Sequence, residues 1–214
     1  LKLHLIEQSP VLRQMQLENL AVYQPQFHNH LVNVPPGPTL LVANEFIDAL
    51  PILQFDRSGG AWHQRQIAID AATGGLTLQT DPLPSRIDSI LPQARDGTVL
   101  EERMGNYAAY IAARLRDSGG AALIIDYGYS PSQSSDTLQA VRRHMKVPIV
   151  EAPGEVDLTA HVDFHHLAIT ASGNGASVHG PVTQAQFLIA LGIAAREATL
   201  LKNAPPEQQE AIRS

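Results

Sequence analysis

The sequence predicts an α/β protein with a mostly parallel sheet, and two apolar runs carry this prediction. Leu40–Ala43 and Ala121–Ile125 are short and contain no polar side chain. Such runs are typical of strands that are buried on both faces of a parallel sheet. Helical patterns alternate with strand-like segments along the rest of the chain, as they do in α/β proteins. Between the two runs the pattern also predicts an inserted antiparallel β-meander.

The bulk composition fits a globular protein and excludes several classes of function. The chain has 214 residues, a formal net charge of −6 and no cysteine. A nucleic-acid-binding protein normally has a basic surface, so we expect no nucleic-acid partner. No apolar segment approaches the roughly 18–20 residues of a membrane-spanning helix, so we expect no membrane span. The lack of cysteine excludes disulfides and thiolate metal sites, and agrees with a reducing compartment.

The first 38 residues predict a strand, a helix and a second short strand. Leu1–Glu7 alternates apolar and polar side chains and ends in a carboxylate. Ser9 suits the N-cap of a helix that begins at Pro10 and continues to about Leu20. Phe27-His28 is a candidate for the second strand.

The central strand, Thr39–Ala43, is followed at once by polar residues. Asn44, Glu45 and Asp48 lie between this strand and a proline. In open α/β sheets, ligands bind at the carboxyl ends of the strands, so these three residues are the first catalytic candidates. The alternative is that Asn44 only caps a short turn over Glu45–Leu50.

After this turn the pattern changes to short strand-like runs that are separated by glycine-containing turns. The three runs are Ile52–Asp56, Ala61–Ile69 and Gly75–Thr80. They predict an antiparallel meander over residues 52–80, inserted into a core made of residues 1–51 and 81–214. Trp62, the only tryptophan, is expected to be a core or lid residue of the meander rather than a platform for a cofactor.

The second half of the chain continues the alternation of helices and strands. Glu101–Asp117 has an apolar stripe at helical spacing and ends at a pair of glycines. The strand Ala121–Ile125 leads into Asp126 and Tyr127, and Asp163 suits the cap of another helix. Further predictions are a short helix from Asp136 through His144, a strand over Ala176–Val182 and a long helix over Thr183–Lys202.

The strand ends bring polar residues to one edge of the predicted sheet. Right-handed crossovers place Glu7, Asn44-Glu45 and Asp126-Tyr127 along a single crevice. A carboxylate that closes a strand in a nucleotide-binding unit commonly accepts hydrogen bonds from ribose hydroxyls, and this is the role expected of Glu7. The alternative is an exposed glutamate at a strand end. No glycine-rich phosphate loop occurs within the 214 residues.

Seven short motifs occur in an order that indicates a family. They are Glu7–Arg13, Ala43–Phe55, Asp126–Tyr129, Asp136–Arg142, Pro153–Phe164, Gly180–Gln184 and Phe187–Ile193. Together they closely resemble the MidA family of S-adenosylmethionine (SAM)-dependent methyltransferases, which includes the mitochondrial complex I assembly arginine methyltransferase. The resemblance covers nearly the whole chain.

This resemblance implies a Rossmann-like class I methyltransferase sheet whose last strand runs antiparallel to the rest. It also implies SAM as the cofactor and a protein arginine, or a similar nitrogen, as the methyl acceptor. The family's first strand and glycine-rich SAM loop precede the position of Leu1, and the family continues past Ser214. Because both ends of the chain lie inside recognisable elements, we expect a fragment. A truncated protein that does not bind SAM is the alternative.

The resemblance further assigns residues to cofactor and substrate. The residues implied for cofactor binding are Glu7, Gln8, Ser9 and Asn44. Those implied for the substrate pocket are Phe46, Asp126, Tyr127 and His161. The meander is implied to be an insertion on the substrate side.

Methyl transfer to a guanidinium requires groups that make a nitrogen lone pair available. Carboxylates bind a guanidinium bidentately, orient it and accept its proton. Glu45 and Asp48 are three residues apart, which places them on one side of a helical turn. We therefore predict Glu45 as the guanidinium clamp, Asn44 as a positioning acceptor, Asp48 as a third catalytic residue and Tyr127 as a wall of the pocket.

Other interpretations stay open beside this one. His161, Asp163, His165 and His166 are metal-binding residue types, but Asp163 suits a helix cap better, so no metal is expected. A non-catalytic assembly or scaffold protein that keeps the fold is the second candidate function, and the sequence before Leu1 discriminates between the two. A nicotinamide dehydrogenase would also use a ribose-binding glutamate, but it leaves the polar turn after the central strand without a role.

The expected partners and location follow from the family. The partner is a protein substrate, for which a respiratory complex I subunit is one candidate, and a homodimer is a further option. The expected location is the cytoplasm of a bacterium, or the mitochondrial matrix if the source is a eukaryote.

Overall fold

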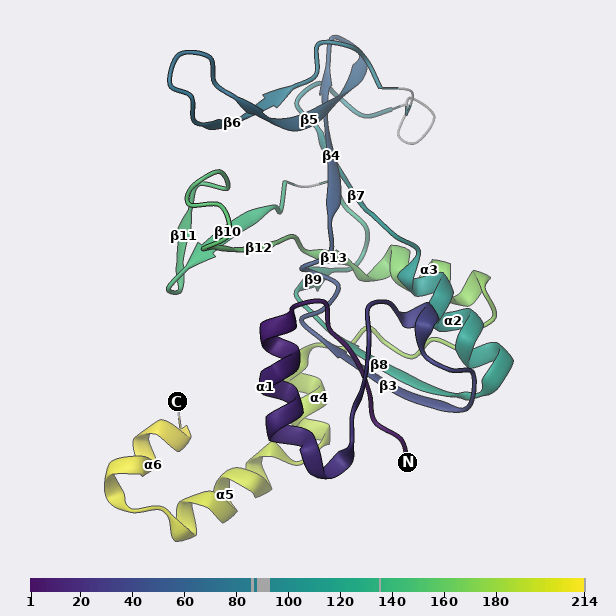
Figure 1. Cartoon of the computed structure of the whole chain (residues 1–214), viewed down its shortest axis with the longest axis vertical. Helices are drawn as coiled ribbons and strands as arrows, with labels where there is room; N and C mark the ends of the chain where they lie inside the picture. Colours follow the sequence, from purple (N-terminus) through teal and green to yellow (C-terminus); the bar gives the residue numbers. More distant parts are fainter. Residues whose placement is uncertain (86, 88–92, 135, 214) are drawn as a thin grey trace. The chain divides into compact units, whose positions relative to one another are not determined.

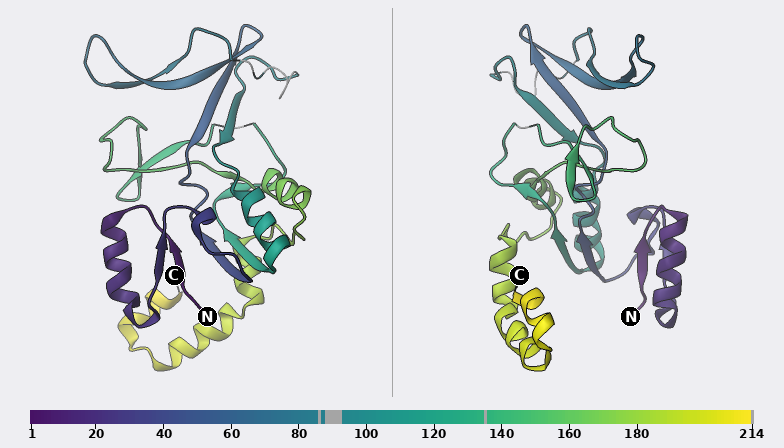
Figure 2. Two further views of the ribbon diagram at one scale, coloured as in Figure 1. Left: turned by 45° about the vertical axis from the view of Figure 1, so that its right-hand side comes forward. Right: turned by 90° about the vertical axis from the view of Figure 1, so that its left-hand side faces the viewer.

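The computed structural model describes residues 1–85, 87, 93–134 and 136–213 of the chain. These residues form two compact units, Leu1–Val178 and His179–Ser214. In the first unit, Figures 1 and 2 show the meander at one end and the helices at the other. No helix in the described residues is long and apolar enough to cross a membrane.

Two parallel strand pairs form the α/β part of the first unit. β1 (His4–Ile6) pairs with β2 (Gln26–His28), and β3 (Thr39–Asn44) pairs with β8 (Gly120–Ile125). The helix α1 (Pro10–Leu20) connects the first pair and begins at the predicted residue. Its cap is also as predicted, because the side chain of Ser9 accepts a hydrogen bond from the amide of Leu12 at 3.3 Å. Two short 3-10 turns, Ala21–Tyr23 and Leu31–Asn33, complete this part.

The core of the α/β part lies on one face of the β3–β8 pair. Leu31, Val34 and Ile111 are buried there, with Leu41 and Ile124 packed against them. Ile111 comes from α2 (Tyr107–Ser118), which ends at a glycine as predicted. Alternate side chains of a strand point to opposite faces, so the core receives every second residue of β3.

The other face of β3 is open, contrary to the prediction of a strand buried on both sides. Leu40 is 77% exposed and Val42 is 71% exposed. The apolar run therefore predicted the strand correctly and its burial wrongly. Among the described strands, β8 is the only hydrogen-bonded neighbour of β3.

The insertion is an antiparallel sheet of four strands rather than three. Its order is β6-β5-β4-β7, with β4 (Ile52–Ser58), β5 (Ala61–Ile69), β6 (Leu76–Thr80) and β7 (Val99–Arg103). Trp62 is fully buried in this sheet, as a core residue should be.

The strand β7 corrects the prediction of a helix that begins at Glu101. Its residues pair with β4 from Ile52↔Arg103 to Asp56↔Val99, so a strand far away in the sequence determines their conformation. Gly105 then turns the chain with a φ of 88°, and the helix begins only at Tyr107.

A second small sheet replaces the helix that we predicted from Asp136 through His144. It contains β10 (Gln139–Arg142), β11 (Met145–Val147) and β12 (Asp157–Thr159), with β10 in the middle. Arg143 and His144 form the two-residue turn of the hairpin, with φ values of 49° and 64°. Two successive residues in the left-handed region match the twist of a tight hairpin. The usual hairpin sequences are Asn-Gly and Asp-Gly, so the Arg-His pair did not indicate a turn.

A short parallel pair carries the chain from the sheet edge into α3. β9 (Gly128–Tyr129) pairs with β13 (Val162–Asp163), and α3 (Phe164–Gly173) follows at once. Asp163 caps this helix as predicted by accepting a hydrogen bond from the amide of His166 at 2.8 Å. A Cβ at Gly128 would lie 2.1 Å from the carbonyl oxygen of Val162, so only glycine fits there.

The second unit consists of three helices. These are α4 (Gln184–Ala190), α5 (Ile193–Asn203) and α6 (Pro206–Arg213). The predicted single helix over Thr183–Lys202 begins correctly, with a capping box between Thr183 and Gln186, but it is broken at Gly192, where φ is 84°. The strand predicted over Ala176–Val182 is absent, since that segment is irregular in the structure.

Candidate functional site

The ends of β3 and β8 meet at one edge, as the sequence predicted. The two strands are parallel and in register, so Asn44 lies opposite Ile125. The amide of Glu45 continues the ladder by donating to the carbonyl oxygen of Ile125 at 2.9 Å. Asn44 and Glu45 are therefore neighbours of Asp126 and Tyr127, and both residues of the first pair are exposed to solvent.

Glu45 occupies an unusual backbone conformation. Its φ is 48°, in the left-handed region that costs a residue with a side chain roughly 1–2 kcal/mol. Strain of this kind is found most often at functional sites. The Tyr127 hydroxyl donates a hydrogen bond to Glu45 Oε1 at 3.4 Å, and the negative charge of Glu45 raises the pKa of Tyr127.

Asp126 holds the turn that carries these residues. Its Oδ2 accepts hydrogen bonds from the amides of Ile47 at 2.9 Å and Asp48 at 3.3 Å. Its Oδ1 accepts one from the amide of Tyr127 at 3.2 Å. Its carboxylate therefore binds backbone, which is a different use from the substrate contact that the sequence suggested.

Asp48 is buried beneath the same turn. Its side chain is 5% exposed, and Oδ1 has no hydrogen-bond partner within the described part of the chain. Burial raises the pKa of Asp48, and the neighbouring charges of Asp126 and Glu45 raise it further. A buried carboxyl that resists ionisation is a poor partner for a solvent-borne cation, so Glu45 suits the predicted clamp better.

Arg103 fixes this turn to a distant segment, a role that no sequence pattern indicates. Its Nη1 donates to the carbonyl oxygens of Asp48 at 3.1 Å and Leu50 at 2.8 Å. Its Nη2 donates to those of Ala160 at 2.7 Å and His161 at 3.0 Å. All four terminal N–H bonds of the guanidinium are thus used on backbone oxygens.

A pocket of about 510 Å³ lies beside the turn. Its lining includes Ile47, Leu50, Glu102, Tyr107, Tyr129 and His161. Of the predicted substrate-pocket residues, His161 alone lines it. Phe46 does not line the pocket, but its ring contacts the ring of the lining residue Tyr107 edge-on, with centroids 5.7 Å apart.

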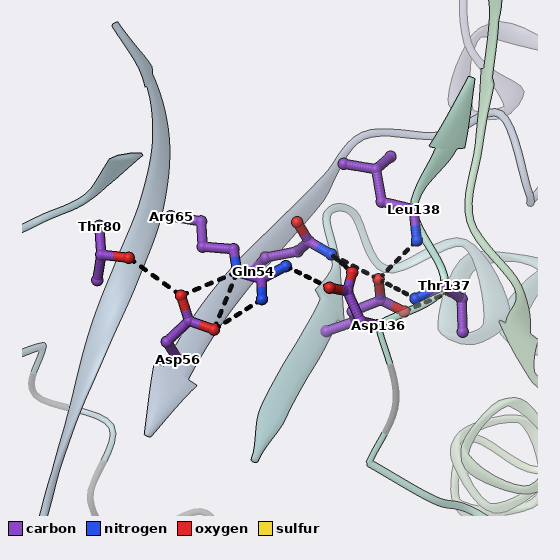
Figure 3. A network of polar contacts seen from close by, with 8 residues as sticks. Gln54, Asp56, Arg65, Thr80, Asp136, Thr137 and Leu138 are labelled. Carbon is purple, nitrogen blue, oxygen red and sulfur yellow. Dashed lines mark hydrogen bonds and ion pairs between the residues drawn. The ribbon is translucent and has the colours of Figure 1, made fainter. Parts of the chain in front are cut away.

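A buried polar network joins the meander to the pocket (Figure 3). The Gln54 amide donates to Glu101 Oε1 at 2.8 Å and to Asp136 Oδ1 at 2.9 Å. Glu101 Oε1 also accepts hydrogen bonds from the amides of Thr137 at 2.9 Å and Leu138 at 3.0 Å.

The network continues in both directions. Arg65 bridges Asp136 at 2.7 Å and Asp56 at 2.8 Å in the meander. On the other side, the amide of His161 donates to the hydroxyl of Thr137 at 2.9 Å. A chain of hydrogen bonds therefore runs from the inserted sheet to a residue that lines the pocket. These hydrogen bonds join residues that are far apart in the sequence, so no single stretch of sequence predicts the network.

Glu7, Gln8 and Ser9 form a separate polar group at the start of α1. Glu7 Oε1 accepts a hydrogen bond from the amide of Ser9 at 2.8 Å, and Oε2 has only a long contact of 3.5 Å with Gln16. The Gln8 amide donates to the carbonyl oxygen of Asn29 at 3.2 Å. Within the described residues, no hydrogen bond joins this group to the strand ends of β3 and β8.

The histidine-rich segment before α3 does not assemble a metal site within the described residues. Asp163 Oδ1 is occupied by the amide of His166 and by the hydroxyl of Ser132, the latter at 2.9 Å. The helix-cap interpretation of Asp163 accounts for both contacts.

Comparisons with known proteins agree with the motif order. A family described as "putative S-adenosyl-L-methionine-dependent methyltransferase" matches residues 1–182. Protein arginine methyltransferase NDUFAF7 of Danio rerio is 34% identical over 231 residues, which cover 96% of this chain and 54% of that protein. The human protein of the same name is 31% identical over 191 residues, with 87% and 43% covered. The chain thus spans about half the length of the curated relatives that it matches.

Solved structures show the same α/β methyltransferase fold. A Burkholderia thailandensis protein with bound S-adenosyl-homocysteine is 24% identical and superposes with a TM-score of 0.77, covering 99% of this chain and 57% of that one. A native crystal structure of an uncharacterised protein from the same organism gives the same TM-score and identity, with 99% and 59% covered.

Proposed function

Because this chain belongs to the MidA family of SAM-dependent methyltransferases, we propose that it forms part of an enzyme that methylates a protein arginine. Family membership was the conclusion drawn from the seven motifs, and the comparisons confirm it. The activity itself is proposed for the whole protein, of which this chain matches about half in its relatives.

The observation that carries the proposal is that Glu45 has an exposed carboxylate and a strained backbone conformation. It follows β3 directly and lies beside Asn44, at the sheet edge where α/β proteins bind ligands. Its backbone φ of 48° costs free energy, and Tyr127 holds one of its oxygens. The other oxygen has no hydrogen-bond partner within the described part of the chain and is available to a substrate.

We further propose that the two parallel strand pairs are parts of one Rossmann-like sheet. Ile6 of β1 packs against the same core cluster as Leu41 of β3 and Ala122 of β8. This packing supports a common layer, although β1–β2 and β3–β8 are separate ladders. In such a sheet, the carboxyl ends of β1, β3 and β8 serve one cofactor crevice.

The residues present fit the ribose end of SAM. Glu7 Oε2 is nearly free, and it closes β1 at the position where a carboxylate accepts ribose hydroxyls. Gln8 and Ser9 follow Glu7 directly before α1, and the family resemblance also implies Asn44, at the end of β3, for cofactor binding. When bound, SAM supplies an electrophilic methyl group.

The role of Glu45 in the reaction is to bind, orient and deprotonate. A guanidinium has no free lone pair while it is fully protonated, so a nitrogen must lose a proton as its new bond to carbon forms. The free oxygen of Glu45 accepts that proton after holding the guanidinium by charge-assisted hydrogen bonds. Asn44 positions the same nitrogen, and Tyr127 limits the movement of Glu45. Most of the rate enhancement would come from orientation.

The family also indicates partners and location. We propose a protein substrate, with a respiratory complex I subunit as the first candidate, and a homodimer as the assembly to test. The curated relatives are named mitochondrial, which supports the matrix for a eukaryotic source. A bacterial source would place the protein in the cytoplasm.

The experiment is a calorimetric titration of the full-length gene product with SAM and S-adenosyl-homocysteine. Incubation with arginine-containing proteins and mass spectrometry for an added methyl group then follows. Binding together with arginine methylation supports the proposal. If neither ligand binds, the protein is a non-catalytic scaffold that retains the fold, and the proposal is wrong.

A further inference from the structure

Three acidic residues line the pocket beside the turn, Glu101, Glu102 and Asp163, and Glu102 is the one whose side chain accepts no hydrogen bond from a described residue. Glu102 of β7 lines it and is exposed, and its side chain makes no hydrogen bond or ion pair with any described residue. Its neighbour Glu101 also lines the pocket, but its Oε1 already accepts three hydrogen bonds, from Gln54, Thr137 and Leu138. Glu102 is therefore the acidic group that a ligand would meet.

The cation already present in the pocket does not neutralise Glu102. Arg103 is the next residue along β7 and also lines the pocket. Its guanidinium gives all four terminal N–H bonds to the carbonyl oxygens of Asp48, Leu50, Ala160 and His161. The negative charge of Glu102 therefore remains available to a cationic group that enters from outside.

The walls suit a long side chain with an apolar stem. Ile47, Leu50 and Leu100 provide aliphatic surface, and the half-buried ring of Tyr107 provides an aromatic face. Arginine and lysine bury their methylene stems along apolar surface and hold their charged ends near a carboxylate or an aromatic ring. A volume of about 510 Å³ is within the range of ligand pockets and is ample for one such side chain.

The pocket lies close to the proposed reaction point but does not include it. Glu45 is absent from the lining, whereas the next residue, Phe46, touches the pocket wall through Tyr107 at a centroid distance of 5.7 Å. Ile47, which lines the pocket, is two residues from Glu45, and consecutive Cα atoms are about 3.8 Å apart, so this part of the wall lies within about 8 Å of Glu45, measured between Cα atoms. An extended substrate rises about 3.3 Å per residue, so a side chain one to three positions from the acceptor reaches the pocket.

We propose that this pocket selects substrates with a second basic side chain, arginine or lysine, one to three residues from the methylated arginine, and that Glu102 pairs with it. This inference rests on the proposed function and adds a specificity pocket to it. Glu102 binds substrate through its charge and takes no part in the transfer of the methyl group.

The test compares two acceptor peptides in the full-length gene product. One contains a single arginine, and the other adds a lysine two residues away. We expect the wild type to prefer the second peptide in kcat/KM by about 5–10-fold, the range of a partly exposed charge-assisted hydrogen bond. Glu102→Gln should remove this preference by raising KM without lowering kcat. Glu151→Gln, at an exposed glutamate in the loop after β11, is the matched control and should keep the preference.

Charge reversal gives a second readout that loss of folding does not mimic. Glu102→Arg should prefer a peptide with glutamate in place of the added lysine, while its affinity for S-adenosyl-homocysteine stays at the wild-type value. Equal rates for both peptides in the wild type overturn the specificity pocket and leave the proposed function intact. A kcat loss for every peptide in Glu102→Gln also overturns it, since Glu102 would then hold the acceptor itself. If the wild type methylates no arginine, the proposed function is what fails.

Discussion

Asp126 Oδ2 accepts a hydrogen bond of 2.9 Å from the amide of Ile47, a residue 79 positions earlier in the chain. The same oxygen accepts the amide of Asp48 at 3.3 Å, so the end of β8 holds the turn that follows β3. Glu45 lies at the start of that turn, with its backbone in the left-handed region. The position of the proposed guanidinium clamp therefore depends on a carboxylate that accepts hydrogen bonds from backbone amides.

Replacement of Asp126 should loosen this turn. In Asp126→Ala, the amides of Ile47, Asp48 and Tyr127 lose their acceptor, and we expect the free energy of unfolding to fall by about 1–3 kcal/mol. Urea denaturation measures the change, and methyl transfer should fall with it. Asp117→Ala is the control, because Asp117 pairs only with the exposed Arg116, and its unfolding midpoint should not move. An unchanged urea midpoint in Asp126→Ala would show that the hydrogen bonds from Asp126 do not stabilise the turn.

Glu45 should be required for transfer and not for stability. Glu45→Gln keeps the shape and removes the charge, so we expect methyl transfer to disappear while S-adenosyl-homocysteine still binds. Glu45→Gly should also be inactive, yet it should gain up to about 1 kcal/mol of unfolding free energy, because glycine adopts a φ of 48° without a steric cost. A radiolabelled methyl-transfer assay checks the loss of activity in both variants, and thermal denaturation checks the gain in stability of Glu45→Gly. Undiminished turnover in Glu45→Gln would remove Glu45 from the mechanism.

Local features of the sequence predicted local structure well. Ser9 and Asp163 each cap a helix at the predicted residue, because a cap needs only a short polar side chain and the amides two or three residues later. Thr183, predicted as the first residue of a helix, is the N-cap of α4. The meeting of Glu45 with Tyr127 was also predictable, since parallel strands place their carboxyl ends at one edge.

Features that depend on distant pairing were not predictable. Glu101–Arg103, predicted as the start of a helix, belongs instead to the strand β7 because it pairs with β4. The four bonds of Arg103 and the burial of Asp48 arise only when that strand, the turn after β3 and residues 160–161 come together. A single sequence carries no record of these contacts, so the pocket wall was missed while the strand-end residues were found.

Arg103 should be difficult to replace even by lysine. Its planar guanidinium serves four carbonyl oxygens, and an ammonium has three donors in a different geometry. We expect Arg103→Lys to lower the free energy of unfolding by about 1–3 kcal/mol, because at least one of the four carbonyl oxygens loses a charged donor. Arg116→Lys on the exposed face of α2 is the matched control and should behave as wild type. Equal thermal midpoints for the two variants would contradict this account.

Asp48 and Asp56 should make opposite contributions to the pH dependence of stability. Burial raises the pKa of Asp48 above its usual value of 3.8, so folding disfavours its ionised form, and stability is lost as the pH rises through the folded pKa. Asp48→Asn should remove that loss, so the variant should gain on the wild type as the pH rises from 3 to 7.

The pKa of Asp56 is lowered by its hydrogen bond from Arg65, so its contribution is present above 3.8 and is lost as the pH falls. Asp56→Asn should therefore be less stable than the wild type near neutral pH and approach it in acid. Urea unfolding at several pH values measures both differences. A stability difference between Asp48→Asn and the wild type that does not change with pH would show that this buried carboxyl titrates alike in the folded and unfolded chains.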